Sequence, residues 1–289
     1  MHKALERNMP SPCSQVPARD TILIVGADGM IGSKLGELAT RSGIRWRGTS
    51  RRVGAQWQLD LKMHPDSWQI PASTEIAIIC AGRAKLEDCE ANPDETRAIN
   101  FTAMLELAGR LKSVGSRVVY LSTNQVFDLD YTALADESTP VSPANEYGRQ
   151  KAAVEAAILA FSPKNIVIRL TKVLSTDHGI LKEWINCIAD GQIIMAYDNL
   201  YCSPILLNDA GRQILDIAMN RNGGIYHLCS SNSISYYQLA KSLLLKMNAD
   251  LNLIKCAHLQ TTKGTQSVQL RSLKTRPLSN GFWCSAPSV

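Results

Sequence analysis

The chain has 289 residues, of which 45% are hydrophobic and 20% are charged, a balance that is ordinary for a soluble globular protein. Its 31 basic and 26 acidic residues give a net charge of +5 and are spread along the chain, which gives little support to nucleic-acid binding. No run approaches the roughly 18 apolar residues that cross a bilayer, so we expect no membrane partner.

Residues 1–20 hold three prolines and no apolar core of a signal peptide, and we expect them to form a flexible leader. The eight cysteines show no C-x-x-C pair and no recurring spacing, and several stand in apolar runs such as A-I-I-C-A-G. This pattern indicates reduced thiols in a cytoplasmic protein, with neither a disulfide framework nor a metal site.

Short apolar runs alternate with helical patterns over the first 170 residues. The run T-I-L-I-V at 21–25 has the length and β-branching of a buried strand, and a helical stretch follows it to about Ser42. Further strands are expected at 44–49, 75–80, 117–122 and 165–170, with helices beginning near Pro93 and at Tyr147 between them. This alternation predicts a Rossmann-like, doubly wound α/β fold, in which helices cover both faces of a parallel sheet.

From about Ser175 the pattern becomes mixed. Helical segments at 180–189, 208–219 and 236–247 are separated by turns and short strands such as G-I-Y-H-L at 224–228. We interpret residues 175–289 mainly as a smaller α/β substrate-binding lobe over the carboxyl ends of the strands, where open α/β sheets bind ligands. Residues 21–174 are then the dinucleotide-binding domain, which part of the C-terminal half continues.

A glycine-rich turn, G-A-D-G-M-I-G, follows the first strand directly, with Gly26, Gly29 and Gly32 in a G-x-x-G-x-x-G spacing. Glycines in this position let the backbone approach a pyrophosphate, which then lies on the N-terminus of the next helix. The plain alternative is an ordinary turn between a strand and a helix. The preceding strand and the following helix favour a dinucleotide site.

The residues after the second strand bear on which dinucleotide binds. An acid there is typical of NAD, because it binds the ribose 2′-hydroxyl, whereas arginine accommodates a 2′-phosphate. Ser50, Arg51 and Arg52 stand at this place, and no acid follows until Asp60. We therefore predict NADP(H) rather than NAD(H), although these arginines could also form a solvated edge.

The stretch N-E-Y-G-R-Q-K opens an alanine-rich helix with Tyr147 and Lys151 four residues apart. Positions i and i+4 lie on one face of a helix, so the phenol and the ammonium can reach the same small volume. A nearby cation lowers the pKa of a phenol, and such a tyrosine can act as a general acid. A surface tyrosine and a surface lysine are the alternative that these two residues alone leave open.

Three motifs together, G-A-D-G-M-I-G, S-T-N-Q-V-F after a strand and Y-G-R-Q-K opening a helix, resemble the extended short-chain dehydrogenase/reductase family. Within it the chain is most similar to the dTDP-4-dehydrorhamnose reductase branch. Similar segments are C-E-A-N-P-D-E-T-R-A-I-N, D-E-S-T-P-V-S-P-A-N-E-Y-G and G-I-Y-H-L-C-S-S-N-S-I-S-Y-Y-Q-L-A, so the resemblance runs from about Thr21 to Arg276.

The resemblance implies an NADPH-dependent reductase that acts on a keto group of a nucleotide-activated sugar, in deoxysugar or cell-surface polysaccharide biosynthesis. Tyr147 would donate a proton to the carbonyl oxygen, Lys151 would hold the nicotinamide ribose, and Thr123 would hydrogen-bond the reacting oxygen. Further cofactor contacts are implied for Gly26, Gly29, Met30 and Ile31 at the pyrophosphate, Asp60 and Leu61 at the adenine, Ala81 and Gly82 at the cofactor's middle, and Ser122 near the nicotinamide. A homodimer is one quaternary state that we leave open.

The chain departs from the branch at positions that face the sugar in the family. Asn124 and Gln125 replace the branch's Asp-Tyr, and Lys172 stands where the branch has an aromatic residue. These three residues are our expected substrate contacts, and Lys172 suits an acidic or phosphorylated group unless it is a solvated strand end.

Three other functions occur in proteins that share these motifs. Sugar 4,6-dehydratases carry Asp-Glu after the threonine, and Asn124 and Gln125 cannot act as acid or base. Epimerase-reductases need a cysteine where Gln125 stands and a histidine near His178, which by itself is better explained as a loop residue. A regulatory subunit that binds NADP without catalysis remains an alternative, although Thr123, Tyr147 and Lys151 are all present.

Overall fold

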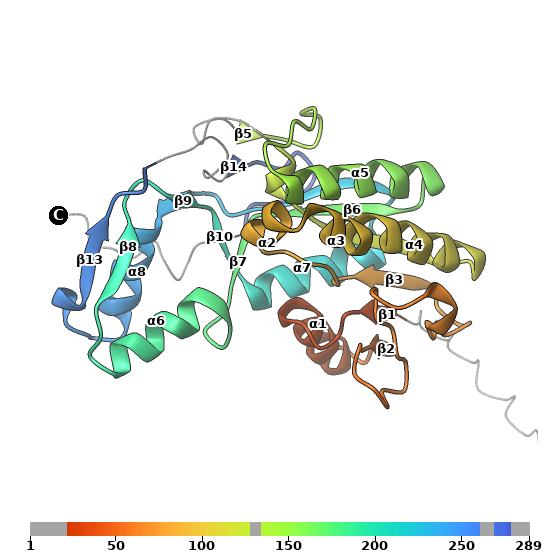
Figure 1. Ribbon diagram of the computed structural model, residues 1–289, viewed down its shortest axis with the longest axis horizontal. Coiled ribbons are helices and arrows are strands. Elements are labelled where there is room, and N and C mark those ends of the chain that lie inside the picture. Colours follow the sequence, from red (N-terminus) through yellow and green to blue (C-terminus); the bar gives the residue numbers. More distant parts are fainter. Residues whose placement is uncertain (1–21, 128–133, 261–268, 279–289) are drawn as a thin grey trace, which may run out of the picture.

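The computed structural model describes residues 22–127, 134–260 and 269–278, and its centre is a six-stranded parallel sheet (Figure 1). Across the sheet the strand order is β11-β6-β4-β3-β1-β2. Their bounds are β1 Ile22–Val25, β2 Trp46–Thr49, β3 Ile76–Ile79, β4 Arg117–Thr123, β6 Ile166–Leu170 and β11 Gly224–Leu228. The predicted parallel sheet is confirmed, while the predicted leader at 1–20 lies outside the described residues.

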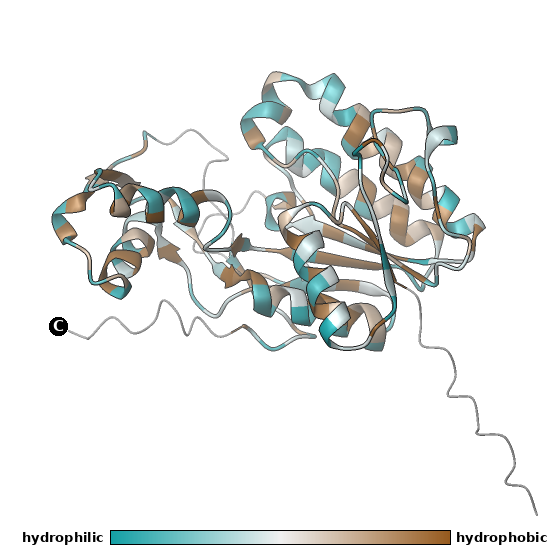
Figure 2. Cartoon of the chain, turned by 90° about the horizontal axis from the view of Figure 1, so that it is seen from below, coloured by the Kyte–Doolittle hydropathy of each residue, from teal (hydrophilic) through white to brown (hydrophobic). Residues whose placement is uncertain are grey.

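Both faces of the sheet are covered by helices, which explains the continuous apolar runs of the strands. Alternate residues of β1 and β3 pack on one side with α1 (Met30–Arg41) and α7 (Leu207–Asn220). The other alternate residues pack with α4 (Ala103–Ser113) and α5 (Glu146–Phe161). Figure 2 shows the apolar strands as brown ribbons between these helices.

The helix that the sequence predicted from Pro93 is divided in three. It begins as α3 (Pro93–Arg97), passes through a π-helical turn η2 (Ala98–Thr102) and continues as α4. Proline occupies the first turn of α3, where its missing N–H has no helical partner to lose. A short helix that was not predicted, α2 (Leu86–Ala91), precedes α3.

The smaller lobe has a hydrophobic core of its own. Helices α6 (Gly179–Ala189) and α8 (Tyr236–Lys246) pack against a two-stranded parallel sheet of β8 (Ile194–Tyr197) and β13 (Ile254–Ala257). Three further strand pairs lie outside these two sheets: β7 (Lys172–Leu174) with β10 (Pro204–Leu206), β9 (Tyr201–Cys202) with β12 (Ile234–Ser235), and β5 (Leu134–Ala135) with β14 (Gln269–Leu270). Among the described residues, no helix is both long and apolar enough to span a bilayer.

Two segments that we grouped with the lobe belong to the central sheet instead. Strand β11 pairs in parallel with β6 and forms an edge of the sheet. Helix α7 packs through Ile214 and Ile217 beside α1, and Gly211 lets the two helices approach, since a Cβ there would lie 2.7 Å from Leu38. The physical reason is that β6 would otherwise be an exposed edge, which β11 covers.

A buried ion pair fixes α5 to the sheet. Arg169 on β6 donates from Nη2 to Glu155 Oε2 at 2.7 Å, and the two side chains are 3% and 4% exposed. The guanidinium also lies 5.0 Å from the Phe127 ring and 3.4 Å from His227 Nε2. Burial lowers the pKa of His227, the Glu137 carboxylate opposes this shift, and the Arg169 guanidinium adds to it. Arg169 is therefore the ion-pair partner that holds Glu155, and through it α5, against β6.

Glu155→Ala should lower the free energy of unfolding by about 3–5 kcal/mol, because it leaves the Arg169 guanidinium buried without its counter-ion. Urea denaturation measures the loss. Glu183→Ala, an exposed site on α6, is the control and should change stability little. Equal small losses in both variants would show that α5 is held by apolar packing alone.

Candidate active site

The site residues predicted from sequence follow the carboxyl ends of neighbouring strands. Because β2, β1, β3, β4 and β6 are parallel neighbours, these ends meet at one edge of the sheet. The chain leaves β1 toward β2 on one side and continues from β3 toward β4 on the other. A change of direction of this kind creates the crevice in which open α/β sheets bind ligands.

The glycine turn lies between β1 and α1 at this edge. Gly26 has φ +84°, and a Cβ there would lie 3.1 Å from Ala81 after β3. A Cβ at Gly32 would overlap the Gly26 carbonyl oxygen, so α1 can begin close to the strand only with glycine there. Gly29 caps α1, and Met30 and Ile31 are its first residues, whose N–H groups have no partner within the helix. Such a helix end attracts an anion.

The segment after β2 faces the glycine turn. Arg51 and Arg52 are exposed, and the Ser50 hydroxyl donates to the carboxylate of Asp28, which lies in the turn itself. Arg52 Nε is 3.7 Å from the same carboxylate. Asp28 was not among the predicted coenzyme contacts, because the acid typical of an NAD site lies beyond the second strand.

Asp60 and Leu61, predicted at the adenine, lie in the loop that leads from β2 to β3. The Asp60 carbonyl accepts a hydrogen bond from Trp68 Nε1 at 2.7 Å, and Leu61 is half-buried against the cluster that contains Trp68. Trp68 therefore holds this loop against the sheet near the strand ends.

The loop after β3, which carries Ala81 and Gly82, is held by Asn100 of the π-helical turn. Asn100 Oδ1 accepts from the Arg83 N–H at 2.8 Å, and its Nδ2 donates to the Arg83 carbonyl at 2.9 Å and to Gln150 Oε1 at 2.8 Å. Asn100 and Gln150 are 1% and 0% exposed. The amide thus joins the loop to α5, a role for Asn100 that the sequence pattern did not predict.

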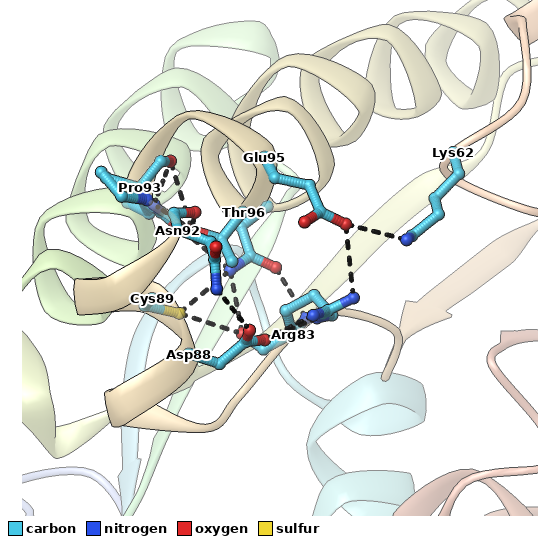
Figure 3. A network of polar contacts seen from close by, with 10 residues as sticks. Lys62, Arg83, Asp88, Cys89, Asn92, Pro93, Glu95 and Thr96 are labelled. Atoms are coloured by element: carbon cyan, nitrogen blue, oxygen red, sulfur yellow. Dashed lines mark hydrogen bonds and ion pairs between the residues drawn. The ribbon is translucent and has the colours of Figure 1, made fainter.

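Figure 3 shows the charged side of the same loop. Arg83 pairs with Asp88 at 2.7 Å and lies 3.7 Å from Glu95, which also pairs with Lys62 at 2.8 Å. The Thr96 hydroxyl donates to the Asn92 carbonyl at 2.9 Å, and the Cys89 thiol to the Arg83 carbonyl at 3.7 Å. These contacts fix α2 and α3 around the loop.

Helix α5 begins in direct contact with the end of β4. Asn145 caps the helix by accepting from the Gly148 N–H at 2.8 Å, and it donates to Gln125 Oε1 at 2.8 Å. A Cβ on Gly148 would overlap the Gln125 carbonyl oxygen. Glycine after Tyr147 therefore allows the first turn of α5 to reach the segment that follows Thr123.

The structure brings Ser122, Thr123, Tyr147 and Lys151 to this junction. Lys151 is buried, donates from Nζ to the Leu121 carbonyl at 2.8 Å and lies 4.3 Å from the Tyr120 ring centre. Its Nζ is 5.8 Å from the centre of the Tyr147 ring. The Thr123 hydroxyl oxygen accepts from the Gln125 N–H at 3.2 Å.

The prediction that Lys151 lowers the pKa of Tyr147 is wrong for this structure. Burial raises the pKa of the Tyr147 phenol above its ordinary value of 10.0, and the Cys89 thiol adds to the rise. Burial lowers the pKa of Lys151 from 10.5 to about 8, and the Glu155 carboxylate partly opposes this shift. Desolvation therefore exceeds the attraction that the i, i+4 spacing suggested, and the phenol stays protonated near neutral pH.

The three expected substrate contacts differ in how exposed their side chains are. Asn124 is 5% exposed, and Gln125 is half-buried with its side-chain oxygen bound by Asn145. Lys172 is exposed at the start of β7, where the chain passes from β6 into the lobe. His178, considered for an epimerase, is exposed and stands at the N-cap of α6.

Buried hydroxyl groups without a partner mark the same edge. Ser122 Oγ, the Tyr120 hydroxyl and Thr171 Oγ1 make no hydrogen bond, although these residues are 5%, 0% and 5% exposed. A buried polar atom without a hydrogen bond lowers the stability of the folded chain, so such atoms often form a hydrogen bond with a bound ligand. Within the described part of the chain, no group of three or more His, Cys, Asp or Glu side chains could hold a metal ion.

A parallel sheet of this strand order, with a glycine turn after its first strand, defines an α/β protein of the Rossmann type. The sequence profile described as RmlD substrate binding domain matches residues 20–280, and the chain belongs to this family. The resemblance to the reductase branch of the extended short-chain dehydrogenases/reductases is thereby confirmed.

Relatives of known name support this placement. A dTDP-4-keto-6-deoxy-D-glucose reductase from Streptomyces niveus is 27% identical over 238 residues, which cover 80% of each chain. A dTDP-4-dehydrorhamnose reductase from Mycobacterium tuberculosis is 27% identical over 242 residues, which are 80% of this chain and 77% of the relative. The crystal structure of a dTDP-4-dehydrorhamnose reductase from Bacillus anthracis in complex with NADP has a TM-score of 0.75 and 22% identity, covering 87% and 89% of the two chains.

The buried ammonium of Lys151 predicts a pH dependence of stability. Its pKa of about 8 in the folded chain lies below its ordinary 10.5, so the folded chain releases the proton first as pH rises. The cost of the buried charge is thus present below pH ~8 and is relieved above it. Between pH ~8 and ~9.5, the unfolding free energy of the unmutated chain should therefore rise by about 2 kcal/mol relative to that of Lys151→Met. Urea titrations at several pH values measure it, and a constant difference would contradict the buried charge.

Proposed function

We propose that the chain is an NADPH-dependent reductase of a keto group on a nucleotide-activated sugar, similar to the dTDP-4-dehydrorhamnose reductases. The observation that carries this proposal is the junction of β4 and α5, where Thr123, Tyr147 and Lys151 meet at the same edge of the sheet as the glycine turn. The named relatives reduce sugar nucleotides, which supports the same substrate class here.

The residues at the sheet edge suit a dinucleotide. The N-terminus of α1 with Gly26 and Gly29 offers N–H groups to a pyrophosphate, and the exposed Arg51 and Arg52 can approach a 2′-phosphate from solvent. The unpaired Ser122 hydroxyl offers a hydrogen bond near the nicotinamide position. The solved relative that binds NADP supports the choice of this coenzyme.

The chain's own part in the reaction is to place groups and to supply a proton. When bound, NADPH supplies a hydride, and negative charge then develops on the carbonyl oxygen of the sugar. Tyr147, which is kept protonated by burial, donates its phenolic proton to this oxygen, while the Thr123 hydroxyl hydrogen-bonds it. Lys151 carries a positive charge below pH ~8 and stabilises the phenolate that remains.

We assign coenzyme binding to the central sheet with its helices, including α7 and β11, and substrate binding to the lobe built on α6 and α8. Lys172 lies at the start of β7, where the chain passes from the central sheet into the lobe. All six cysteines within the described ranges are free thiols, which suits the reducing conditions of the cytoplasm, where we place the enzyme.

Tyr147→Phe should lower kcat/KM with a 4-keto sugar nucleotide by about 10²–10⁴-fold, the usual contribution of a general acid, while the Kd for NADPH stays unchanged. Steady-state NADPH oxidation and fluorescence titration measure the two quantities. As a control, Tyr197→Phe removes a phenolic hydroxyl from an exposed position in the lobe and should change neither kcat/KM nor the Kd for NADPH. No turnover with a broad panel of such sugars, despite NADPH binding, would favour the regulatory subunit instead.

Lys172→Met should lower kcat/KM for sugars that bear a carboxylate or phosphate by roughly tenfold relative to a 6-deoxy sugar, because a charge-assisted hydrogen bond is lost. Lysine offers three donors to such a group, whereas methionine offers none. Lys182→Met, exposed on α6, is the control for the change in net charge. An unchanged ratio between the two substrate types would remove Lys172 from the substrate site.

A further inference from the structure

The Lys151 ammonium, at the junction of β4 and α5, lies among groups that carry no charge at neutral pH. Its Nζ donates to the Leu121 carbonyl at 2.8 Å and lies 4.3 Å from the centre of the Tyr120 ring. Burial raises the pKa of the Tyr120 phenol and of the Cys89 thiol, and raises that of the Cys80 thiol to about 12, so all three stay protonated. These groups therefore do little to compensate the ammonium for its loss of water.

On its own helix, Lys151 has a titratable neighbour four residues away on either side. The centre of the Tyr147 ring is 5.8 Å from Nζ, and this phenol is protonated as well. Glu155 is a carboxylate one turn further along the same face, and Lys151 and Glu155 are 7% and 3% exposed. Burial lowers the pKa of Lys151, and the charge of Glu155 raises it again in part. Two buried charges attract each other more strongly than two exposed ones.

Arg169 keeps the Glu155 carboxylate ionised. Its Nη2 donates to Glu155 Oε2 at 2.7 Å, and its Nε donates to the two carboxylate oxygens at 3.2 and 3.1 Å. The guanidinium is held in turn by the Phe127 ring at 5.0 Å and by His227 Nε2 at 3.4 Å. Arginine does not lose its proton in proteins, so this buried carboxylate always has a cation beside it. The ion pair joins β6 to α5, and its negative member stands on the helix of Lys151.

We propose that Glu155 is a positioning residue for the reaction, whose carboxylate holds the buried Lys151 ammonium in its charged form at neutral pH. This inference rests on the proposed function, in which a charged Lys151 stabilises the phenolate that Tyr147 leaves behind. The ion pair with Arg169 then has two separable roles. Its contact fixes α5 to the sheet, and its negative charge acts on the reacting end of the helix.

The first test is the pH profile of kcat for a 4-keto sugar nucleotide at saturating NADPH. In the unmutated chain, kcat falls at alkaline pH as Lys151 loses its proton. Glu155→Gln removes the charge but keeps the size of the side chain, so the fall should begin about one pH unit lower, as expected for a buried charge one helix turn away. Glu155→Asp keeps the charge and should leave the fall at its original pH. A uniform loss of kcat at every pH in Glu155→Gln would mean that Glu155 only holds the helix, and would overturn the proposal.

The second test needs neither coenzyme nor sugar, so its outcome is independent of the proposed function. Urea denaturation at several pH values gives the unfolding free energy of a chain relative to that of the same chain with Lys151→Met. This difference rises with pH from the point at which the folded chain releases the Lys151 proton. With Glu155→Gln in both chains, the rise should begin about one pH unit lower. A lower onset combined with no turnover of any sugar would uphold the effect of Glu155 on Lys151 and overturn the proposed function instead.

Two further variants complete the second test. Glu155→Gln leaves Arg169 buried without its counter-ion, so the double change Glu155→Gln, Arg169→Met provides a chain with no unpaired buried charge if the single variant does not fold. With both charges removed, the rise should still begin at a lower pH than in the unmutated chain. An unchanged onset would show that Arg169 cancels the charge of Glu155, and would overturn the proposal. Glu183→Gln, exposed on α6, changes the net charge equally and should leave the onset in place.

Discussion

The position of α5 depends on one buried pair of charges. Glu155 and Arg169 can be removed from water only together, so the helix is fixed along β6 at the place where they meet. Tyr147, Lys151 and Glu155 follow one another at intervals of four, and the same contact therefore sets the depth at which the phenol and the ammonium lie. The two catalytic candidates at one end of the helix are thus positioned by an electrostatic constraint two turns away.

A second set of contacts makes the two halves of the site interdependent. Gln150 lies between the two catalytic candidates on α5, and its side-chain oxygen accepts a hydrogen bond from Asn100. Asn100 also forms hydrogen bonds with the backbone N–H and the carbonyl of Arg83. The loop that would touch the middle of a dinucleotide and the helix that would touch its nicotinamide ribose thus share one buried amide network. A displacement of either element would leave polar atoms of this network unpaired.

Much of the fold could be predicted because its signals are local. Buried strands such as β1 and β3 are visible as apolar runs, and the glycine turn and the start of α5 have their own sequence patterns. What was missed depends on contacts between distant segments: β11 at the sheet edge, the hold of Asn100 on Arg83, and the meeting of Asp28 with Ser50. The direction of the Tyr147 pKa was wrong because spacing along a helix reports proximity but not the loss of solvent around a side chain.

The edge position of β11 has a consequence for synthesis on the ribosome. Strand β6 is complete at Leu170, but its pairing partner emerges more than fifty residues later, at 224–228. During that interval the nascent sheet offers an unpaired parallel edge, and α7 has not yet covered the apolar face beside α1. Arg271, the partner of Asp136, emerges later still. The central sheet is thus among the last parts of the molecule to be finished, although its first strand is made near the beginning.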